Sequence, residues 1–135
     1  MTSSMKKTRA VAFDFVLDEL FVVNPTVKPM FGCHGVYVKD QIVLILRNME
    51  GGSNDNGVWI ATTHEHHESL RKDLPTMRSI EVFGGAESGW QNLPSEDEHF
   101  EEDVMKVCNL IIKGDRRIGK TPKPRKKKTP PNSRR

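Results

Sequence analysis

The chain has 135 residues and a formal net charge of +3 at pH 7, which hides two oppositely charged parts. Residues 1–113 carry eleven basic and seventeen acidic side chains, a net charge of −6, and residues 114–135 carry ten basic side chains and one acid, a net charge of +9. No apolar run reaches the roughly 20 residues of a membrane-spanning helix. The sequence therefore excludes a helical membrane protein and predicts one acidic domain followed by a basic tail.

The start of the chain and its cysteines bear on the cellular compartment. Residues 1–8 are polar and are predicted to be disordered. A basic start before apolar residues is typical of a secretory signal peptide, but Asp14 and Asp18 interrupt the apolar stretch and no small-residue cleavage site follows. Cys33 and Cys108 form no C-x-x-C pattern, so neither a disulfide framework nor a cysteine zinc site is expected. We therefore expect a cytoplasmic protein with reduced cysteines.

The first predicted element is an amphipathic helix over residues 9–23. Its apolar side chains recur at the helical spacing i, i+3, i+4, i+7 and i+8, and they are Phe13, Val16, Leu17, Leu20 and Phe21. Acidic side chains occupy the opposite face. Asn24-Pro25 ends the helix, because the residue before a proline disfavours the α region.

Extended segments follow this helix. Residues 27–38 are predicted as one extended stretch with glycines at bulges, and Lys39-Asp40 as a two-residue turn. Residues 42–46 form a continuous apolar run, which is typical of a strand covered on both faces. A loop rich in glycine and asparagine separates this run from a third strand over residues 58–61.

The second half of the domain is predicted to contain two helices and two strands. Spacing and flanking turns indicate a short helix over residues 64–73, a half-buried strand over residues 77–83 and an edge strand over residues 90–93. The last helix follows Ser95. The predicted order is therefore helix, three strands, helix, two strands, helix. This order predicts an α+β fold in which an antiparallel sheet carries helices packed on one face.

The last helix has the clearest predicted boundaries. Ser95 and Glu98 match a capping box at its start. Lys113 lies in its last turn, and Gly114 matches a left-handed cap. The folded domain is therefore predicted to cover residues 9–113.

A histidine cluster, Thr63-His64-Glu65-His66-His67, is the first candidate for chemistry. On a helix His64 and His67 are neighbours and could share a metal ion, with His34 or His99 as a third ligand if folding brings one close. The spacing differs from H-E-x-x-H, and solvated histidines are the simpler interpretation. A metal-dependent enzyme is therefore the least favoured function, and no metal or other cofactor is predicted.

Two further clusters suggest catalysis but have simpler explanations. Cys33 and His34 could be a nucleophile and its base, but neighbouring side chains of a strand point to opposite faces, which favours a packed cysteine. A group of acids at the start of the last helix matches the helix dipole, which favours a solvated face. This group comprises Glu96, Asp97, Glu98, Glu101, Glu102 and Asp103. We therefore expect no catalytic residue and no small-molecule substrate.

The basic tail, residues 114–135, carries the strongest functional signal. Its one apolar residue, Ile118, cannot offset the entropy of ordering the segment, so disorder is predicted. No aromatic residue is interleaved, which predicts nucleic-acid binding without base stacking or sequence preference. A solubilising tail and an anionic membrane surface are the alternatives. The cations expected to neutralise phosphates are Arg116, Arg117, Lys120, Lys123, Arg125, Lys126, Lys127 and Lys128.

One pattern begins with Met30-Phe31-Gly32 and Gly35 and continues with an apolar-Tyr step, a polar turn and an apolar strand. This pattern resembles the N-terminal domain of TfoX-type (Sxy-type) bacterial competence regulators. The run Trp90-Gln91-Asn92-Leu93-Pro94 is similar to the family's aromatic-x-x-Leu-Pro entry to its last helix. The resemblance covers about residues 10–113, and the MmcQ/YjbR-like group is similar in layout. The resembled family has no established active site, so the resemblance implies no catalytic residue. The positions that match the family's motif are Met30, Phe31, Gly32 and Gly35.

Together these observations predict a non-enzymatic regulatory or interaction module whose tail binds nucleic acid. The resemblance implies the same order of helices and strands, but the second domain of the competence regulators has no counterpart beside the basic tail. The alternative is a protein-binding adaptor, in which the sheet or the region from Phe31 to Tyr37 contacts an unknown protein partner and the tail only confers solubility. No membrane partner is expected.

Overall fold

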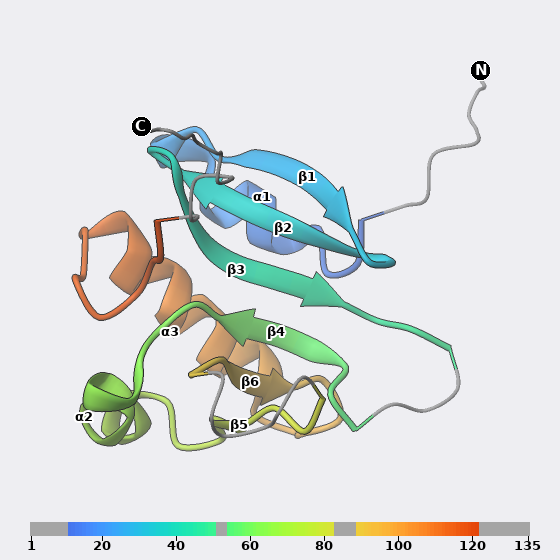
Figure 1. Ribbon diagram of the computed structural model, residues 1–135, viewed down its shortest axis with the longest axis vertical. Coiled ribbons are helices and arrows are strands. Elements are labelled where there is room, and N and C mark those ends of the chain that lie inside the picture. Colours follow the sequence, from blue (N-terminus) through green and yellow to red (C-terminus); the bar gives the residue numbers. More distant parts are fainter. Residues whose placement is uncertain (1–10, 51–53, 83–88, 122–135) are drawn as a thin grey trace, which may run out of the picture.

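The computed structural model describes residues 11–50, 54–82 and 89–121 (Figure 1). Its helices are α1 (Phe15–Glu19), α2 (His67–Asp73) and α3 (Phe100–Ile112), with 3-10 turns η2 (Phe21–Val23) and η3 (His64–His66). Its strands are β1 (Thr26–Met30), β2 (Cys33–Val38), β3 (Gln41–Arg47), β4 (Gly57–Ile60), β5 (Arg78–Ser79) and β6 (Gln91–Pro94). Within these described ranges, no helix has the length and apolar character needed to cross a membrane.

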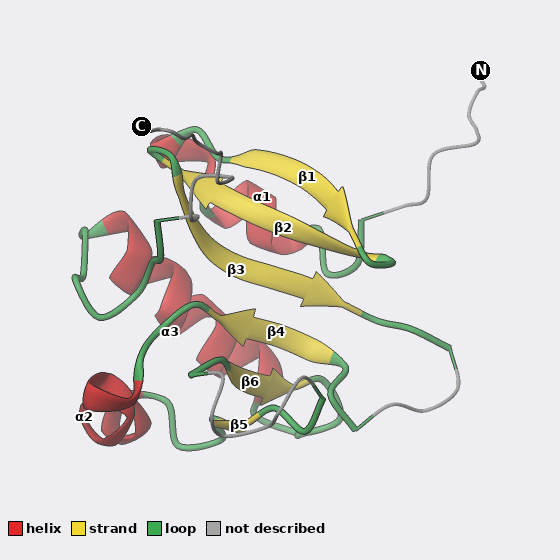
Figure 2. Cartoon of the chain, viewed as in Figure 1, coloured by secondary structure: helices red, strands yellow, loops and turns green. Residues whose placement is uncertain are grey.

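The strands form one antiparallel sheet in the order β1-β2-β3-β4-β6-β5. Helices α1 and α3 lie behind this sheet in the view of Figure 1, and the colours of Figure 2 separate the helical layer from the strands. The predicted α+β class with an antiparallel sheet is therefore confirmed.

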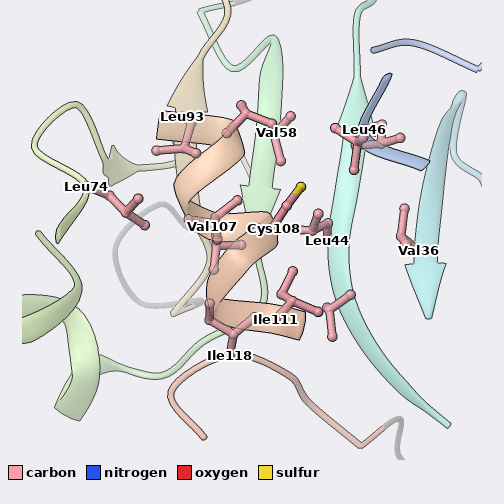
Figure 3. Packing of buried hydrophobic residues seen from close by; sticks show 14 of the residues in the cluster. Val36, Leu44, Leu46, Val58, Leu74, Leu93, Val107, Cys108, Ile111 and Ile118 are labelled. Carbon is pink, nitrogen blue, oxygen red and sulfur yellow. The ribbon is translucent and has the colours of Figure 1, made fainter. Parts of the chain in front are cut away.

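The main core lies between the sheet and α3 (Figure 3). Leu44 and Leu46 of β3 and Val58 of β4 are fully buried there, against Val107 and Ile111 of α3. The neighbouring side chains on the other face of β3, among them Ile42 and Ile45, belong to a second buried cluster. The apolar run over residues 42–46 is thus covered on both faces, as its composition predicts.

The first helix is shorter than the predicted residues 9–23. It ends at Leu20, whose N–H donates to Val16 O, and a 3-10 turn follows. Since a 3-10 turn has about 3.0 residues per turn instead of 3.6, the side chains after Leu20 rotate off the apolar stripe. Val16 and Leu20 are fully buried, but Phe21 is 77 % exposed, so its predicted place in the core is wrong.

The segment predicted as one extended stretch over residues 27–38 is a β-hairpin. Phe31 and Gly32 have φ angles of 50° and 80° and join β1 to β2 as a two-residue turn, a conformation that suits the twist of paired strands. Four strands therefore precede α2, where the sequence predicts three. Lys39-Asp40, with φ angles of 52° and 70°, forms the predicted second turn.

The two strands after α2 also differ from their predictions. β6 lies between β4 and β5 and is not an edge strand. β5 contains only Arg78 and Ser79 of the predicted residues 77–83, the last of which lies outside the described residues. It stops there because the carboxylate of Asp55 accepts hydrogen bonds from the backbone N–H groups of Glu81 and Val82, at 3.0 and 2.9 Å.

The capping box predicted at the start of α3 does not form. The helix begins at Phe100, and Ser95 N–H instead donates to Asn56 O at 3.0 Å, which ties it to the loop before β4. The predicted cap at the other end is present. Gly114 has φ 78°, and its N–H and that of Asp115 donate to Ile111 O and Leu110 O, the paired pattern of a Schellman motif.

Residues 114–121 belong to the fold, so the disorder predicted from residue 114 does not hold for them. Ile118 is 5 % exposed in the main core, and Gly119 N–H donates to Ala61 O at 2.7 Å. Lys120 pairs with Ile42 of β3 through hydrogen bonds of 2.9 and 3.0 Å, beyond the end of β4. This segment has few apolar residues, but backbone pairing with the sheet adds to its single apolar anchor. Residues 1–10 and 122–135 lie outside the described residues, and with them the disorder predicted for residues 1–8 and 122–135.

Candidate nucleic-acid interface

The sheet face opposite α1 and α3 carries aromatic rings that each lie beneath a cation. Its three pairs are Lys28 with Tyr37, Arg47 with Trp59, and Lys120 with Trp90. The rings share this face with the second buried cluster, which contains Ile42, Ile45 and Ala61. We refer to these six residues of the three pairs as the aromatic–cationic face.

Lys28 and Tyr37 lie at the β1 side of this face. The Lys28 Nζ atom is 4.9 Å from the centre of the Tyr37 ring, and the ring is half-buried. A hollow of about 350 Å³ adjoins the pair, lined by Thr26, Lys28, Tyr37, Lys39 and Asp40. Two lysines and one aspartate thus line a polar depression beside an accessible ring.

Trp59 forms the buried centre of the face. It is 2 % exposed, its Nε1–H donates to Asp55 O at 2.8 Å, and its ring lies 6.1 Å from that of Trp90. The Arg47 guanidinium lies 5.4 Å from the Trp59 ring centre. Burial raises the pKa of the Cys33 thiol, and the neighbouring Arg47 partly opposes this effect. This part of the face is therefore a packed support, and its cysteine is held in the unreactive thiol form.

Lys120 brings the C-terminal segment onto the face. Its backbone pairs with Ile42, and its Nζ atom lies 5.2 Å from the centre of the half-buried Trp90 ring. Partial burial lowers the pKa of the Lys120 ammonium. A phosphate placed beside this group would restore a favourable environment for its charge.

The other described cations of the predicted tail have different surroundings. Arg117 donates to Asp73 of α2 at 2.9 Å and to Asp115 at 2.7 Å, and this pairing lowers the pKa of the Asp115 carboxyl. Arg117 thus joins the C-terminal segment to α2, and its predicted role in binding phosphate stays a prediction. Arg116 is exposed. The remaining predicted contacts lie outside the described residues: Lys123, Arg125, Lys126, Lys127 and Lys128.

The histidine cluster does not assemble a metal site. The rings of His64 and His67 lie 5.0 Å apart, but His67 Nε2 is 2.9 Å from Gly89 O. His34 is buried on β2, and His99 lies beside Glu102 at the start of α3. In the described part of the chain, no group of three metal-binding side chains is close enough to hold an ion.

The environment of His67 is expected to make the folding stability decrease at acidic pH. Burial lowers its pKa, against the opposing effect of the Gly89 carbonyl. The unfolded chain, with a histidine pKa of about 6.5, then binds more protons than the folded chain below that pH. Stability should consequently fall as the pH decreases from 7 through 6.5, until the folded histidine also becomes protonated.

Thermal unfolding between pH 7.5 and 5.5 tests this expectation. His67→Gln, whose amide can still donate to Gly89 O, should show a smaller loss of melting temperature over this range than the wild type. His99→Gln, at an exposed position, should retain the wild-type loss. An equal loss in the His67→Gln variant would contradict the assignment.

The two remaining clusters have structural roles. Cys33 packs in the second buried cluster, and the alternation of β2 directs the next residue, His34, to the other face. Among the acids at the start of α3, Asp103 is 2 % exposed and accepts hydrogen bonds from Thr76 N–H and Oγ1–H at 3.2 and 2.6 Å. The predicted solvated face is therefore wrong for Asp103.

The motif residues shape the hairpin between β1 and β2. Phe31 lies at its tip and is 84 % exposed, and Gly32 supplies the positive φ angle that the turn requires. Gly35 leaves room on β2: a Cβ atom there would lie 3.2 Å from Tyr37 Cε1 and 3.3 Å from Met30 Sδ. These residues thus position Tyr37 on the aromatic–cationic face.

Sequence reasoning missed the aromatic–cationic face and the buried Asp55. Asp55 lies in a segment whose composition indicates only a loop, yet it is 1 % exposed and bonds to Arg78, Glu81 and Val82. The two tryptophans were available as a signal, because each lies in a predicted strand. Comparison of the chain with protein-family models, with curated proteins and with solved structures found no match.

Proposed function

We propose that the chain is a non-enzymatic interaction module that binds nucleic acid without reading its sequence. One observation carries the proposal: the last described residues, Lys120 and Thr121, lie against β3, and the Lys120 side chain lies on the aromatic–cationic face. The basic residues of segment 122–135 follow directly from this position in the chain. Folded and tail cations can therefore act on one ligand.

The charge of the tail supports a polyanionic partner. Residues 122–135 contain seven lysines and arginines and no acid. Cations that neutralise phosphates release condensed counterions, which gives affinity without base recognition. Lys28 and Lys120 on the face extend the same charge complementarity onto the folded domain.

We also propose that residues 10–113 form a TfoX N-terminal-like domain of a cytoplasmic protein. The hairpin turn at Phe31-Gly32 and the close packing at Gly35 give the matched motif a physical purpose. Cys33 and Cys108 are free and buried, which suits a reducing compartment. The second domain of the competence regulators is not part of this proposal.

A protein-binding adaptor is the second candidate function. Phe31 at the β1–β2 tip is 84 % exposed, and Phe21 and Val22 of η2 are 77 % and 72 % exposed. Phe21 and Val22 precede β1 and Phe31 follows it, so they offer two separate apolar contact points at the two ends of this strand. In this alternative the basic tail contributes solubility only.

A salt titration distinguishes the two functions. The full chain and a chain that ends after Thr121 would be compared for binding to a 20-base-pair duplex and to a shuffled duplex of equal composition. The full chain should bind both equally, and removal of residues 122–135 should reduce the slope of log K against log salt by about 3 to 6, at about 0.9 for each phosphate neutralised. Negligible binding by both chains at low salt would reject the nucleic-acid function and favour the adaptor.

A further inference from the structure

We propose that the nucleic acid recognised by the aromatic–cationic face is single-stranded, with unpaired bases stacked on Tyr37 and Trp90. This inference rests on the proposed nucleic-acid function and adds the class of ligand to it. It replaces the expectation of binding without base stacking, which considered the tail alone.

The first step is the arrangement of the two rings across the sheet. Tyr37 of β2 is paired in register with Ile42 of β3, and Ile42 is paired with Lys120. Neighbouring strands lie about 4.8 Å apart, so this row spans about 10 Å from Tyr37 to Lys120. The Lys120 side chain then reaches the Trp90 ring. The Tyr37 ring, the Lys120 ammonium and the Trp90 ring therefore follow one another across this part of the face.

The second step is the accessibility of the rings. Tyr37 and Trp90 are half-buried, whereas Trp59 is 2 % exposed beside Trp90. Tyr37 and Trp90 can therefore contact a ligand, and Trp59 can only support Trp90 from the core. Stacking of one base on an aromatic side chain raises affinity by about 5- to 150-fold and tolerates any base, because every base has a π face.

The third step is the distribution of charge around the row. Lys28 is exposed and lies over Tyr37, and Lys39 lines the adjoining hollow together with the acid Asp40. Lys120 lies over Trp90 at the other end. Each lysine lies over a ring, so a base that stacks there displaces the flexible lysine side chain, whose ammonium then contacts the phosphate of that nucleotide. Aromatic rings with adjacent cations are the combination that single-strand-binding grooves use.

A duplex does not fit this face as its preferred ligand. In a duplex, each base stacks on its neighbours in the same strand, and its faces are not available to a side chain. Stacking on Tyr37 and Trp90 requires bases that can leave such a stack, as in single strands, loops and bulges. The basic tail binds both forms through their phosphates, and the face supplies the difference between them.

Binding of the full chain to four probes tests the inference: a 15-nucleotide dT strand, a 15-nucleotide rU strand, a 15-nucleotide abasic strand and a 15-base-pair duplex. The dT or rU strand should bind at least about 10-fold more tightly than the duplex and the abasic strand, given the stacking energy of one to two bases. Equal binding of all probes would overturn the inference. The dT and rU arms show whether the preferred strand is DNA or RNA, and preference for either one supports the proposal.

Matched variants test the two rings. Tyr37→Leu and Trp90→Leu keep an apolar side chain but remove the stacking ring, and each should weaken dT or rU binding by about 10-fold. Tyr37→Phe and Trp90→Phe keep a ring and should stay within about 3-fold of the wild type. In a Trp59→Phe background, Trp90 is the one remaining tryptophan, and its fluorescence should be quenched on binding.

The results separate this inference from the proposed function. If circular dichroism shows that the leucine variants are unfolded, the fluorescence measurement decides the question, because it needs no substitution at Tyr37 or Trp90. Unchanged fluorescence would overturn stacking, and so would leucine variants that fold and bind as tightly as the wild type. The proposed function would remain intact in either case if the full chain still bound the duplex in a salt-sensitive way. Absence of binding to every probe would reject both.

Discussion

A chain that ends after Lys113 is expected to lose most of its folding stability, whereas a chain that ends after Thr121 is expected to keep it. The shorter chain lacks Ile118, whose truncation to alanine alone should cost about 2–5 kcal/mol. It also lacks the backbone pairing with Ile42 and Ala61, at about 1 kcal/mol for each hydrogen bond. The sum approaches the entire stability of a typical domain, about 5–15 kcal/mol.

Urea unfolding of three proteins would measure this effect: the full chain, the chain that ends after Thr121, and the chain that ends after Lys113. Ile118→Ala in the full chain is the matched control, because it removes the apolar anchor and retains the backbone. A chain ending after Lys113 that unfolds at the same urea concentration as the full chain would show that residues 114–121 do not stabilise the fold. Binding studies of the tail should therefore remove residues 122–135 and leave Ile118 in place.

The second large effect is expected at Asp55, where substitution by alanine should cost about 3–5 kcal/mol. Its carboxylate is 1 % exposed and accepts hydrogen bonds from the backbone N–H groups of Glu81 and Val82, and it forms an ion pair with Arg78. Removal of one partner from such a buried network leaves donors without acceptors, which costs more than the bonds themselves contribute.

Chemical denaturation of Asp55→Ala and Asp55→Asn would separate the charge from the hydrogen bonds. The asparagine retains one acceptor oxygen and should lose less stability than the alanine. Glu81→Ala is the matched control, because the backbone N–H of Glu81 is the group that bonds to Asp55, and the substitution retains it. The exposed Glu81 side chain forms a 3.8 Å ion pair with Arg78 and accepts a 3.4 Å hydrogen bond from Asn54, so its loss should cost at most about 1 kcal/mol. Equal stability of Asp55→Ala and the wild type would show that the network does not stabilise the fold.

The sequence predicted those features of the fold that depend on local pattern. The apolar run over residues 42–46 indicated a strand covered on both faces, because composition alone distinguishes such a strand from a half-exposed one. The Gly114 cap was predictable because the left-handed conformation strongly favours glycine. Features that depend on which segments meet were missed. The capping box at Ser95 failed because Asn56 competes for its backbone N–H, and no local pattern reveals that partner.

The candidate site was predictable in its tail and not in its folded part. Basic residues in the tail are visible by composition, so their affinity for phosphates could be predicted. Tyr37 lies on β2, Trp59 on β4 and Trp90 just before β6, and their cations come from segments equally far apart in sequence. Only the strand order and register place them on one face. The pairing of Arg117 with Asp73 was missed for the same reason, because Asp73 lies 44 residues earlier.

The pairing of Lys120 with Ile42 also has a consequence for how the domain folds. The two residues are 78 positions apart, so the loop that their contact closes carries a high entropic cost unless the intervening elements have formed first. We expect the C-terminal segment to dock late, onto a sheet that already contains β3 and β4. The amide protons of Ile42, Gly119 and Lys120 should then exchange with deuterated solvent through a local opening, at a lower free energy than the amides of β3 that bond to β2 and β4.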